Sequence, residues 1–187
     1  RRKIEVNISE LNKELESIRN ERQTQRKQRR RAELPSLALV GYTNAGKSTL
    51  MNTLVEHYKN TDTTSKKELE KDMLFATLET SVRSITLPDN KTFLLSDTVG
   101  FINKLPHNLV KAFRSTLEEV VLADLLLHVV DFSNPDYDQQ IKTTNKTLTQ
   151  IGAGAIPTIY VYNKADLTTF NIPFVKDDQV YLSAKKK

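Results

Sequence analysis

One stretch of eight residues has the spacing of a phosphate-binding loop, G-x-x-x-x-G-K-[ST]. It reads Gly41-Tyr42-Thr43-Asn44-Ala45-Gly46-Lys47-Ser48 and continues into Thr49. Glycines let such a loop wrap tightly and point backbone N–H groups inward, and the helix N-terminus behind it attracts anions. Lys47 is expected to bridge the outer phosphates of a nucleotide, and the Ser48 hydroxyl to bind Mg²⁺. Since the pattern predicts a strand before the loop and a helix after it, a chance glycine turn is the weaker interpretation.

A second candidate is the carboxylate that ends an apolar strand, Asp97. Beside a phosphate-binding loop, an aspartate in this place holds Mg²⁺, and we expect the contact to run through water. Without that loop, an ordinary turn-capping aspartate would be an equally good interpretation. Thr98-Val99-Gly100 follow, and the backbone N–H of Gly100 is expected to face a γ-phosphate.

The segment Asn163-Lys164-Ala165-Asp166 follows another apolar strand and suits a guanine base. The Asp166 carboxylate can accept hydrogen bonds from both the ring N–H and the amino group of guanine. Adenine offers no such pair of donors, so a P-loop ATPase is disfavoured. The methylene stem of Lys164 can cover the base plane, and Asn163 is expected to tie this loop to the phosphate-binding loop.

A third loop, Ser183-Ala184-Lys185, follows the last short strand of the sequence. A backbone N–H in this loop can contact the carbonyl oxygen of guanine. Three residues carry little information, and a simple chain terminus is the alternative interpretation.

These loops need a fold that brings strand ends together, and the hydrophobic pattern predicts one. Polar residues 58–72 indicate a surface loop, and 88–90 a turn between two strands. Helices that recur between buried strands indicate an α/β fold, with three layers and a mainly parallel sheet. Strands are predicted over 37–40, 82–87, 92–96, 125–130, 157–162 and 180–182, and helices over 47–57, 109–122 and 136–151.

Composition excludes several other classes of protein. A chain of 187 residues suits one domain with an appendage, and its 38% hydrophobic and 27% charged residues are ordinary for a globular protein. The absence of cysteine excludes disulfide scaffolds, thiol nucleophiles and cysteine-ligated zinc. No apolar run reaches the ~20 residues of a membrane helix, so no membrane span is expected. His57, His107 and His128 are too scattered for a metal site, and His128 is expected to be a core residue.

The first 34 residues differ from the rest of the chain in charge. They hold 11 Lys/Arg and 6 Asp/Glu, and so account for the whole net charge of +5. Apolar residues recur with a period near 3.5 from Ile4 to Ile18, which predicts a long helix that ends before Pro35. The excess of basic residues predicts that this helix binds a polyanion such as RNA through its phosphates. The alternative is a helix whose charged face is simply exposed to solvent. The candidate RNA contacts are Arg19, Arg22, Arg26, Lys27, Arg29, Arg30 and Arg31.

Several longer strings resemble those of the HflX family of translation-factor-related P-loop GTPases. They are G-Y-T-N-A-G-K-S-T-L from Gly41, L-F-A-T-L from Leu74, D-T-V-G-F-I from Asp97, L-P-H-N-L-V-K-A-F-R-S-T-L-E-E from Leu105 and A-D-L-L-L-H-V-V-D from Ala123. The resemblance implies a Ras-like GTPase domain over 35–187, with GTP and GDP as ligands. Residues 1–34 resemble the family's basic linker helix, at the end of an N-terminal domain that is missing here. The GTPase domain is expected to be truncated before its last helix.

The resemblance also implies site residues that spacing alone does not single out. Thr77, preceded by Phe75 and Ala76, matches the threonine that closes over Mg²⁺ and the γ-phosphate. The expected catalytic groups are then Lys47, Thr77 and Gly100. The expected metal contacts come from Ser48, Thr77 and, through water, Asp97.

Phe101 stands where Ras-like GTPases place a water-orienting glutamine, and HflX-like proteins carry phenylalanine there. Because an apolar side chain cannot polarise water, slow intrinsic hydrolysis is expected. The attacking water would be positioned by backbone groups, by a partner or by a cation. Asn44 matches the asparagine of GTPases that hold K⁺, and a role in bracing the loop is the alternative.

The resemblance implies an Mg²⁺-dependent enzyme that hydrolyses GTP to GDP and phosphate. Such a protein is expected to be a cytoplasmic monomer that acts as a switch on the large ribosomal subunit and its RNA, splitting or rescuing stalled ribosomes under stress. The alternative from another class is a nucleotide-gated RNA-binding module in which hydrolysis is incidental. Turnover in the presence of the partner distinguishes the two.

Overall fold

A computed structural model of the chain describes residues 34–58, 81–101 and 117–186. The chain divides into two units, residues 1–34 and 35–187, and the description that follows concerns the second. The long helix expected before Pro35 lies outside the described residues. Within the described ranges, no helix combines the length and apolar character needed to cross a membrane.

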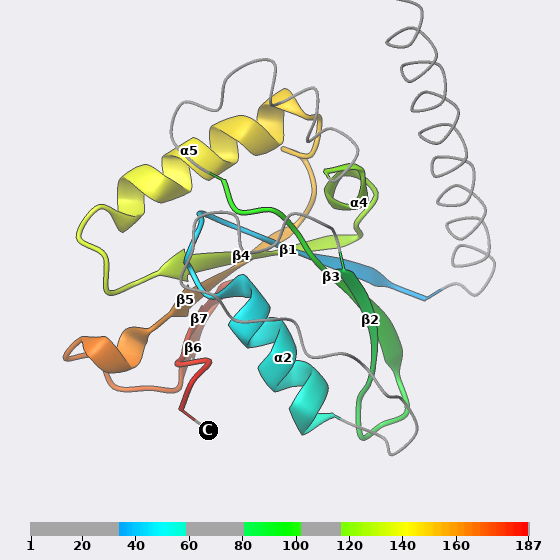
Figure 1. Cartoon of the computed structure of the whole chain (residues 1–187), viewed down its shortest axis with the longest axis horizontal. Coiled ribbons are helices and arrows are strands. Elements are labelled where there is room, and N and C mark those ends of the chain that lie inside the picture. Colours follow the sequence, from blue (N-terminus) through cyan, green and yellow to red (C-terminus); the bar gives the residue numbers. More distant parts are fainter. Residues whose placement is uncertain (1–33, 59–80, 102–116, 187) are drawn as a thin grey trace, which may run out of the picture. The chain divides into compact units, whose positions relative to one another are not determined.

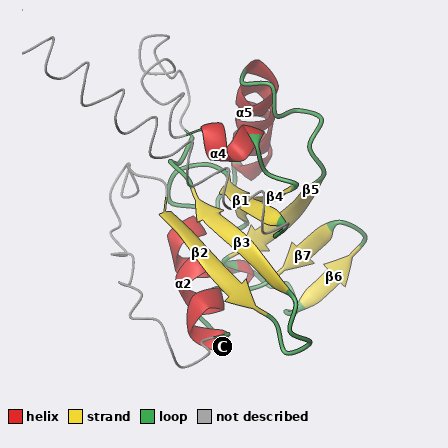
Figure 2. Ribbon diagram, turned by 90° about the vertical axis from the view of Figure 1, so that its right-hand side faces the viewer, coloured by secondary structure: helices red, strands yellow, loops and turns green. Residues whose placement is uncertain are grey.

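The second unit is built on one seven-stranded sheet with the order β2-β3-β1-β4-β5-β7-β6. The five inner strands run parallel to one another, while β2 and β6 pair antiparallel at the two edges. Figure 2 shows the opposed directions of β2 and β3. The strands are β1 (Ser36–Val40), β2 (Ser81–Thr86), β3 (Thr92–Asp97), β4 (Leu125–Asp131), β5 (Thr158–Asn163), β6 (Phe174–Lys176) and β7 (Gln179–Tyr181).

Helices cover both faces of the sheet and complete three layers. One face carries α2 (Lys47–His57), and the other carries α4 (Glu118–Val121) and α5 (Tyr137–Gln150) (Figure 1). A single turn of 3₁₀-helix, Ala165–Leu167, follows β5. The α/β fold with a mainly parallel sheet is therefore confirmed.

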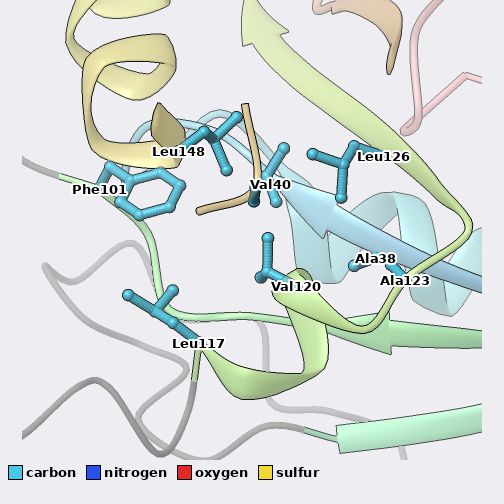
Figure 3. Close-up of a cluster of buried hydrophobic side chains, with 9 residues drawn as sticks. Ala38, Val40, Phe101, Leu117, Val120, Ala123, Leu126 and Leu148 are labelled. Carbon is cyan, nitrogen blue, oxygen red and sulfur yellow. The ribbon is translucent and has the colours of Figure 1, made fainter. Parts of the chain in front are cut away.

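The two faces are filled by alternate residues of the same strands, because successive side chains of a strand point to opposite sides. In β1, Ala38 and Val40 pack toward α4 and α5, while Leu39 packs toward α2. Figure 3 shows the first of these cores. Its buried members are Ala38, Val40, Phe101, Leu117, Val120, Ala123, Leu126, Leu148 and Ala153. The core on the α2 side consists of Leu39, Ala45, Leu50, Met51, Ile85, Leu95, Val129, Val161 and Ala184.

The predicted elements agree closely with those observed. The helix expected over 47–57 has the same bounds as α2, and the predicted strands differ from the observed ones by one or two residues. Of the helix expected over 109–122, the structure describes Glu118–Val121 and the residues beside it. The short strand β6 was not predicted, because its three exposed residues show no alternation of apolar and polar side chains.

The parallel strands place their carboxyl ends along one edge of the sheet. The phosphate-binding loop leaves β1 there, Asp97 ends β3, Asp131 ends β4 and Asn163 ends β5. In open α/β sheets, ligands bind at this edge. The fold therefore brings the three predicted loops to the same place.

Candidate nucleotide-binding site

The phosphate-binding loop depends on glycine at both of its ends. Gly41 has a φ of 142° and Gly46 a φ of 93°, backbone conformations that side chains disfavour. A Cβ atom on Gly41 would collide with the carbonyl oxygen of Val129 in β4. A Cβ atom on Gly46 would collide with the side-chain amide of Asn163. The loop therefore packs closely against both β4 and the predicted guanine-binding loop.

The helix α2 begins at Lys47, directly after this loop, and points its N-terminus at it. No side chain caps the first turn, and no acidic residue lies in it. The first N–H groups of the helix and their partial positive charge are therefore available to an anion. Leu50 N–H donates to the Gly46 carbonyl at 2.9 Å, which begins the helical hydrogen bonding.

Lys47 is a buried cation held against the loop. Its Nζ donates to the carbonyl oxygens of Tyr42 at 3.0 Å and Gly41 at 3.3 Å. Burial lowers the pKa of Lys47 to about 8, and the nearby Asp97 carboxylate opposes part of that shift. A phosphate group beside Nζ would raise the pKa again, because an opposite charge favours the protonated form.

Ser48 and Asp97 form the predicted metal-binding pair. Ser48 Oγ donates to Asp97 Oδ2 at 2.5 Å, and the Asp97 side chain is fully buried at the end of β3. A hydroxyl and a carboxylate are hard oxygen ligands of the kind Mg²⁺ takes, with phosphate oxygens and water completing its octahedron. Within the described ranges no group of three acidic, histidine or cysteine side chains could hold an ion by itself. The site therefore fits a metal that arrives with phosphate.

The segment after Asp97 lies against the phosphate-binding loop. Thr98 Oγ1 donates to the Leu39 carbonyl at 2.6 Å, which anchors the segment to the end of β1. A Cβ atom on Gly100 would lie 2.7 Å from Thr43 Cα and 3.1 Å from Lys47 Nζ. Glycine is therefore required for this close approach. Its backbone stands beside the ammonium that is expected to bind the outer phosphates.

Phe101 pairs with the same loop through its backbone. Its N–H donates to the Gly41 carbonyl at 3.0 Å, and its carbonyl accepts from the Thr43 N–H at 2.9 Å. The side chain points the other way and is 2% exposed, within the core formed with Leu117 and Leu148 (Figure 3). In this arrangement the ring is directed away from the phosphate-binding loop.

Asn163 joins the three loops through both atoms of its amide. Its Nδ2 donates to the Ala45 carbonyl at 2.9 Å, and its Oδ1 accepts from the Ala184 N–H at 2.9 Å. The Ala184 carbonyl in turn accepts from Thr53 Oγ1 of α2 at 2.8 Å. The expected tie between the phosphate-binding and guanine-binding loops is therefore present, and it extends to the last loop.

Neighbouring groups stabilise the ionised form of Asp166. A hydrogen bond from the Ser183 hydroxyl and the ammonium of Lys186, 3.4 Å away, lower the pKa of Asp166. The carboxylate therefore accepts hydrogen bonds but donates none at neutral pH. Lys185, the last residue of the predicted loop, is exposed.

Other candidate residues either lie outside the described ranges or are buried in the core. Phe75, Ala76, Thr77 and His107 lie outside the described residues, as do all the candidate RNA contacts. His128 is buried in β4, and burial lowers its pKa to about 4, with Lys47 acting in the same direction. It is therefore a neutral residue of the interior, as expected.

Sequence reasoning missed two side-chain contacts in this site. For the loop of Ser183 only a backbone N–H contact was predicted, whereas the Ser183 hydroxyl contacts Asp166. Asp131 was not singled out at all, yet its Oδ2 accepts from Lys164 Nζ at 2.7 Å. The available signal was its position: like Asp97, Asp131 is a carboxylate at the end of a buried strand.

Comparison with known proteins identifies related sequences and folds. Residues 36–164 match the family model described as 50S ribosome-binding GTPase. The GTPase HflX of Caldanaerobacter subterraneus subsp. tengcongensis is 46% identical over 187 residues, 100% of this chain and 41% of that protein. The GTPase HflX of Escherichia coli K12 is 39% identical over 191 residues, 99% of this chain and 43% of that protein. The chain therefore spans about two-fifths of the length of these relatives.

Solved structures share the fold. A GTP-binding protein from Sulfolobus solfataricus, in complex with GDP, has a TM-score of 0.59 at 24% identity, over 90% of this chain and 53% of its own. A variant of Era from Aquifex aeolicus, bound to GDP.AlF4-, has a TM-score of 0.58 at 23% identity, over 82% and 52%. With its resemblance to HflX confirmed along its whole length, the chain belongs to the family of 50S ribosome-binding GTPases.

Proposed function

We propose that this chain binds GTP together with Mg²⁺, hydrolyses it to GDP and phosphate, and acts as a switch on the large ribosomal subunit. One observation carries the proposal: the Asn163 amide bridges Ala45 in the phosphate-binding loop and Ala184 in the last loop. That bridge fixes the spacing between a cationic phosphate site and the ionised Asp166. A single nucleotide with a guanine base can then span both.

The proposed roles follow from the surroundings of each residue. Lys47 and the N-terminus of α2 bind the outer phosphates, and the Gly100 N–H faces the γ-phosphate. Ser48, and Asp97 through water, would hold Mg²⁺, which would supply positive charge against the phosphates. Thr77 is proposed to close over the γ-phosphate on the strength of the family resemblance.

In the hydrolytic step, a water molecule attacks the γ-phosphorus while the bond from that phosphorus to the bridging oxygen of GDP breaks, and the proton that the water loses leaves with the inorganic phosphate. Negative charge then grows on the GDP oxygens, where the Lys47 ammonium stabilises it. Slow intrinsic turnover is proposed because the Phe101 side chain is buried in the core and offers no polar group to orient the water.

A monovalent cation near Asn44 is the finer part of this proposal. Asn44 is exposed in the phosphate-binding loop with a φ of 60°, so its side chain is accessible to solvent and to a bound nucleotide. A K⁺ ion there would add positive charge beside the reacting phosphates. Turnover in K⁺ should exceed turnover in Na⁺ at equal ionic strength, and equal rates would remove the cation from the proposal.

The ribosomal role is supported by the family to which the chain belongs. We place the protein in the cytoplasm, as a monomer, where ribosomal RNA is the polyanion available to the basic residues between Arg19 and Arg31. Phosphate contacts by several of these side chains would make binding fall steeply with salt. Splitting or rescue of stalled ribosomes under stress is the proposed outcome of the switch.

The decisive experiment measures GTP turnover with and without purified large ribosomal subunits, using ATP as the control substrate. The proposal is supported if ribosomal subunits strongly stimulate the turnover of GTP but not that of ATP. GTP turnover that ribosomal subunits leave unchanged would contradict the ribosomal role, and equal turnover of ATP would contradict the assignment of Asp166.

The second candidate function is a nucleotide-gated RNA-binding module in which hydrolysis is incidental. The buried ring of Phe101 favours it, because nothing at that position assists hydrolysis. RNA affinity that changes between GDP and a non-hydrolysable GTP analogue, with no stimulated turnover, would favour this candidate over the first.

A further inference from the structure

The carboxylate of Asp131 lies at the end of β4, beside the predicted guanine-binding loop. Its Oδ2 accepts from the Lys164 ammonium at 2.7 Å, and the side chains are 15% and 33% exposed. Its Oδ1 accepts from the Ser133 N–H at 3.1 Å and from Ser133 Oγ at 2.6 Å. Both oxygens therefore have partners, and the carboxylate is held in one orientation.

Backbone contacts fix this carboxylate relative to the loop. Asp131 pairs with Asn163 in the register of β4 and β5, and the Phe132 N–H donates to the Asn163 carbonyl at 2.9 Å. Asn163 is itself bonded to the phosphate-binding loop. The position of Asp131 is thus set by the sheet and does not depend on a bound nucleotide.

Lys164 needs such an anchor for two reasons. Its backbone has a φ of 62°, in the left-handed region that residues with a side chain rarely adopt. Its side chain has four rotatable bonds, and an unattached lysine loses considerable freedom when it is ordered against a ligand. An ion pair present before the nucleotide arrives removes part of that loss.

We propose that Asp131 is a positioning residue for base recognition. It holds the Lys164 ammonium at the end of β4, so that the methylene stem is already positioned to cover one face of the purine ring. Asp131 does not touch the nucleotide and acts through Lys164 alone. This inference rests on the proposed function, because it takes guanine as the base that the loop receives.

The first test is the Asp131→Asn variant, which keeps the shape and one acceptor oxygen, removes the charge and replaces the other oxygen with an amide group that only donates. We expect GDP to bind about fivefold more weakly, as befits a partly exposed ion pair. Asp178→Asn is the matched control, because Asp178 is an exposed carboxylate between β6 and β7. In GTP turnover, KM should rise with kcat unchanged, since the interaction is the same in the ground and transition states.

A double-mutant cycle with Lys164→Met separates positioning from general damage. Methionine keeps an unbranched stem without the ammonium, so Asp131→Asn should have no effect on GDP affinity in that background. An equal loss in both backgrounds would show that Asp131 acts through the fold, and would overturn the inference. Thermal unfolding of each nucleotide-free variant records any loss of stability separately.

The outcomes also separate this inference from the proposed function. A wild-type chain that binds neither GDP nor GTP would overturn the proposed function. A wild-type chain that binds GDP, with Asp131→Asn indistinguishable from Asp178→Asn, would overturn the positioning role alone.

Discussion

Nucleotide affinity and the stability of the empty protein should respond to pH in opposite directions, because both depend on Lys47. Its pKa is lowered from 10.5 to about 8 in the empty site. Phosphate contacts would bring the pKa back toward its ordinary value. Between these two values, binding takes up a proton, so affinity should fall by about tenfold for each pH unit.

The stability effect has the opposite sign. Below pH 8 the folded protein buries a charged ammonium, which costs about 3 kcal/mol relative to the unfolded chain. As pH rises from 8 toward 10.5, the unfolded chain binds more protons at this lysine than the folded chain does. The free energy of unfolding contributed by Lys47 therefore increases over that range.

The assay is the equilibrium affinity for a fluorescent GDP analogue at pH 7.5, 8.5 and 9, with urea unfolding of the empty protein at the same values. Lys47→Arg is the control, because a guanidinium keeps its charge and leaves any titration of the guanine ring unchanged. Affinity that is flat from pH 8.5 to 9, or the same slope in Lys47→Arg, would refute the reasoning. The stability argument would be refuted if the nucleotide-free protein had a lower free energy of unfolding at pH 9 than at pH 7.5 and Lys47→Met showed the same decrease.

Three further predictions concern other residues of the site. Asp166→Asn should shift preference from GTP toward xanthosine triphosphate in competition binding, because an amide can donate to the xanthine carbonyl; unchanged preference would contradict the assignment. Phe101→Gln should destabilise the protein by about 3 kcal/mol in urea unfolding without faster GTP turnover, because position 101 faces the core; faster turnover would show that the side chain reaches the nucleotide. Asn163→Ala should weaken GDP about tenfold or more by removing two hydrogen bonds, whereas Asn171→Ala, at an exposed position, should not.

Much of the fold could be predicted because short signals coincide with element boundaries. Gly46 and Lys47 mark the start of α2, and short apolar runs mark the strands that both cores cover. The edge strand β6 has three exposed residues and exists through its pairing with β7, which no local pattern records.

The site divides in the same way. Motif spacing identifies Lys47, Asp97 and Asp166, because each must face a defined part of one ligand. The ion pair joins Asp131, the last residue of β4, to Lys164, the residue that follows β5, and it depends on the register of β4 against β5. The lowered pKa of Lys47 depends on burial, which the identity of the residue does not reveal.

The Asn163 bridge couples the nucleotide pocket to the unfolding of the domain. It joins Asn163 to Ala45, 118 positions apart, and to Ala184, 21 positions away. Contacts between segments so distant in the chain carry a high loop-closure entropy cost, which the sheet between them must offset. The pocket and the middle of the sheet then belong to one cooperative unit, and slow amide hydrogen exchange in β1 and β5 would accompany nucleotide occupancy. Nucleotide release would then depend on motion at the rim of the pocket. Breaking the Asn163 hydrogen bonds between the loops would require global unfolding of the domain.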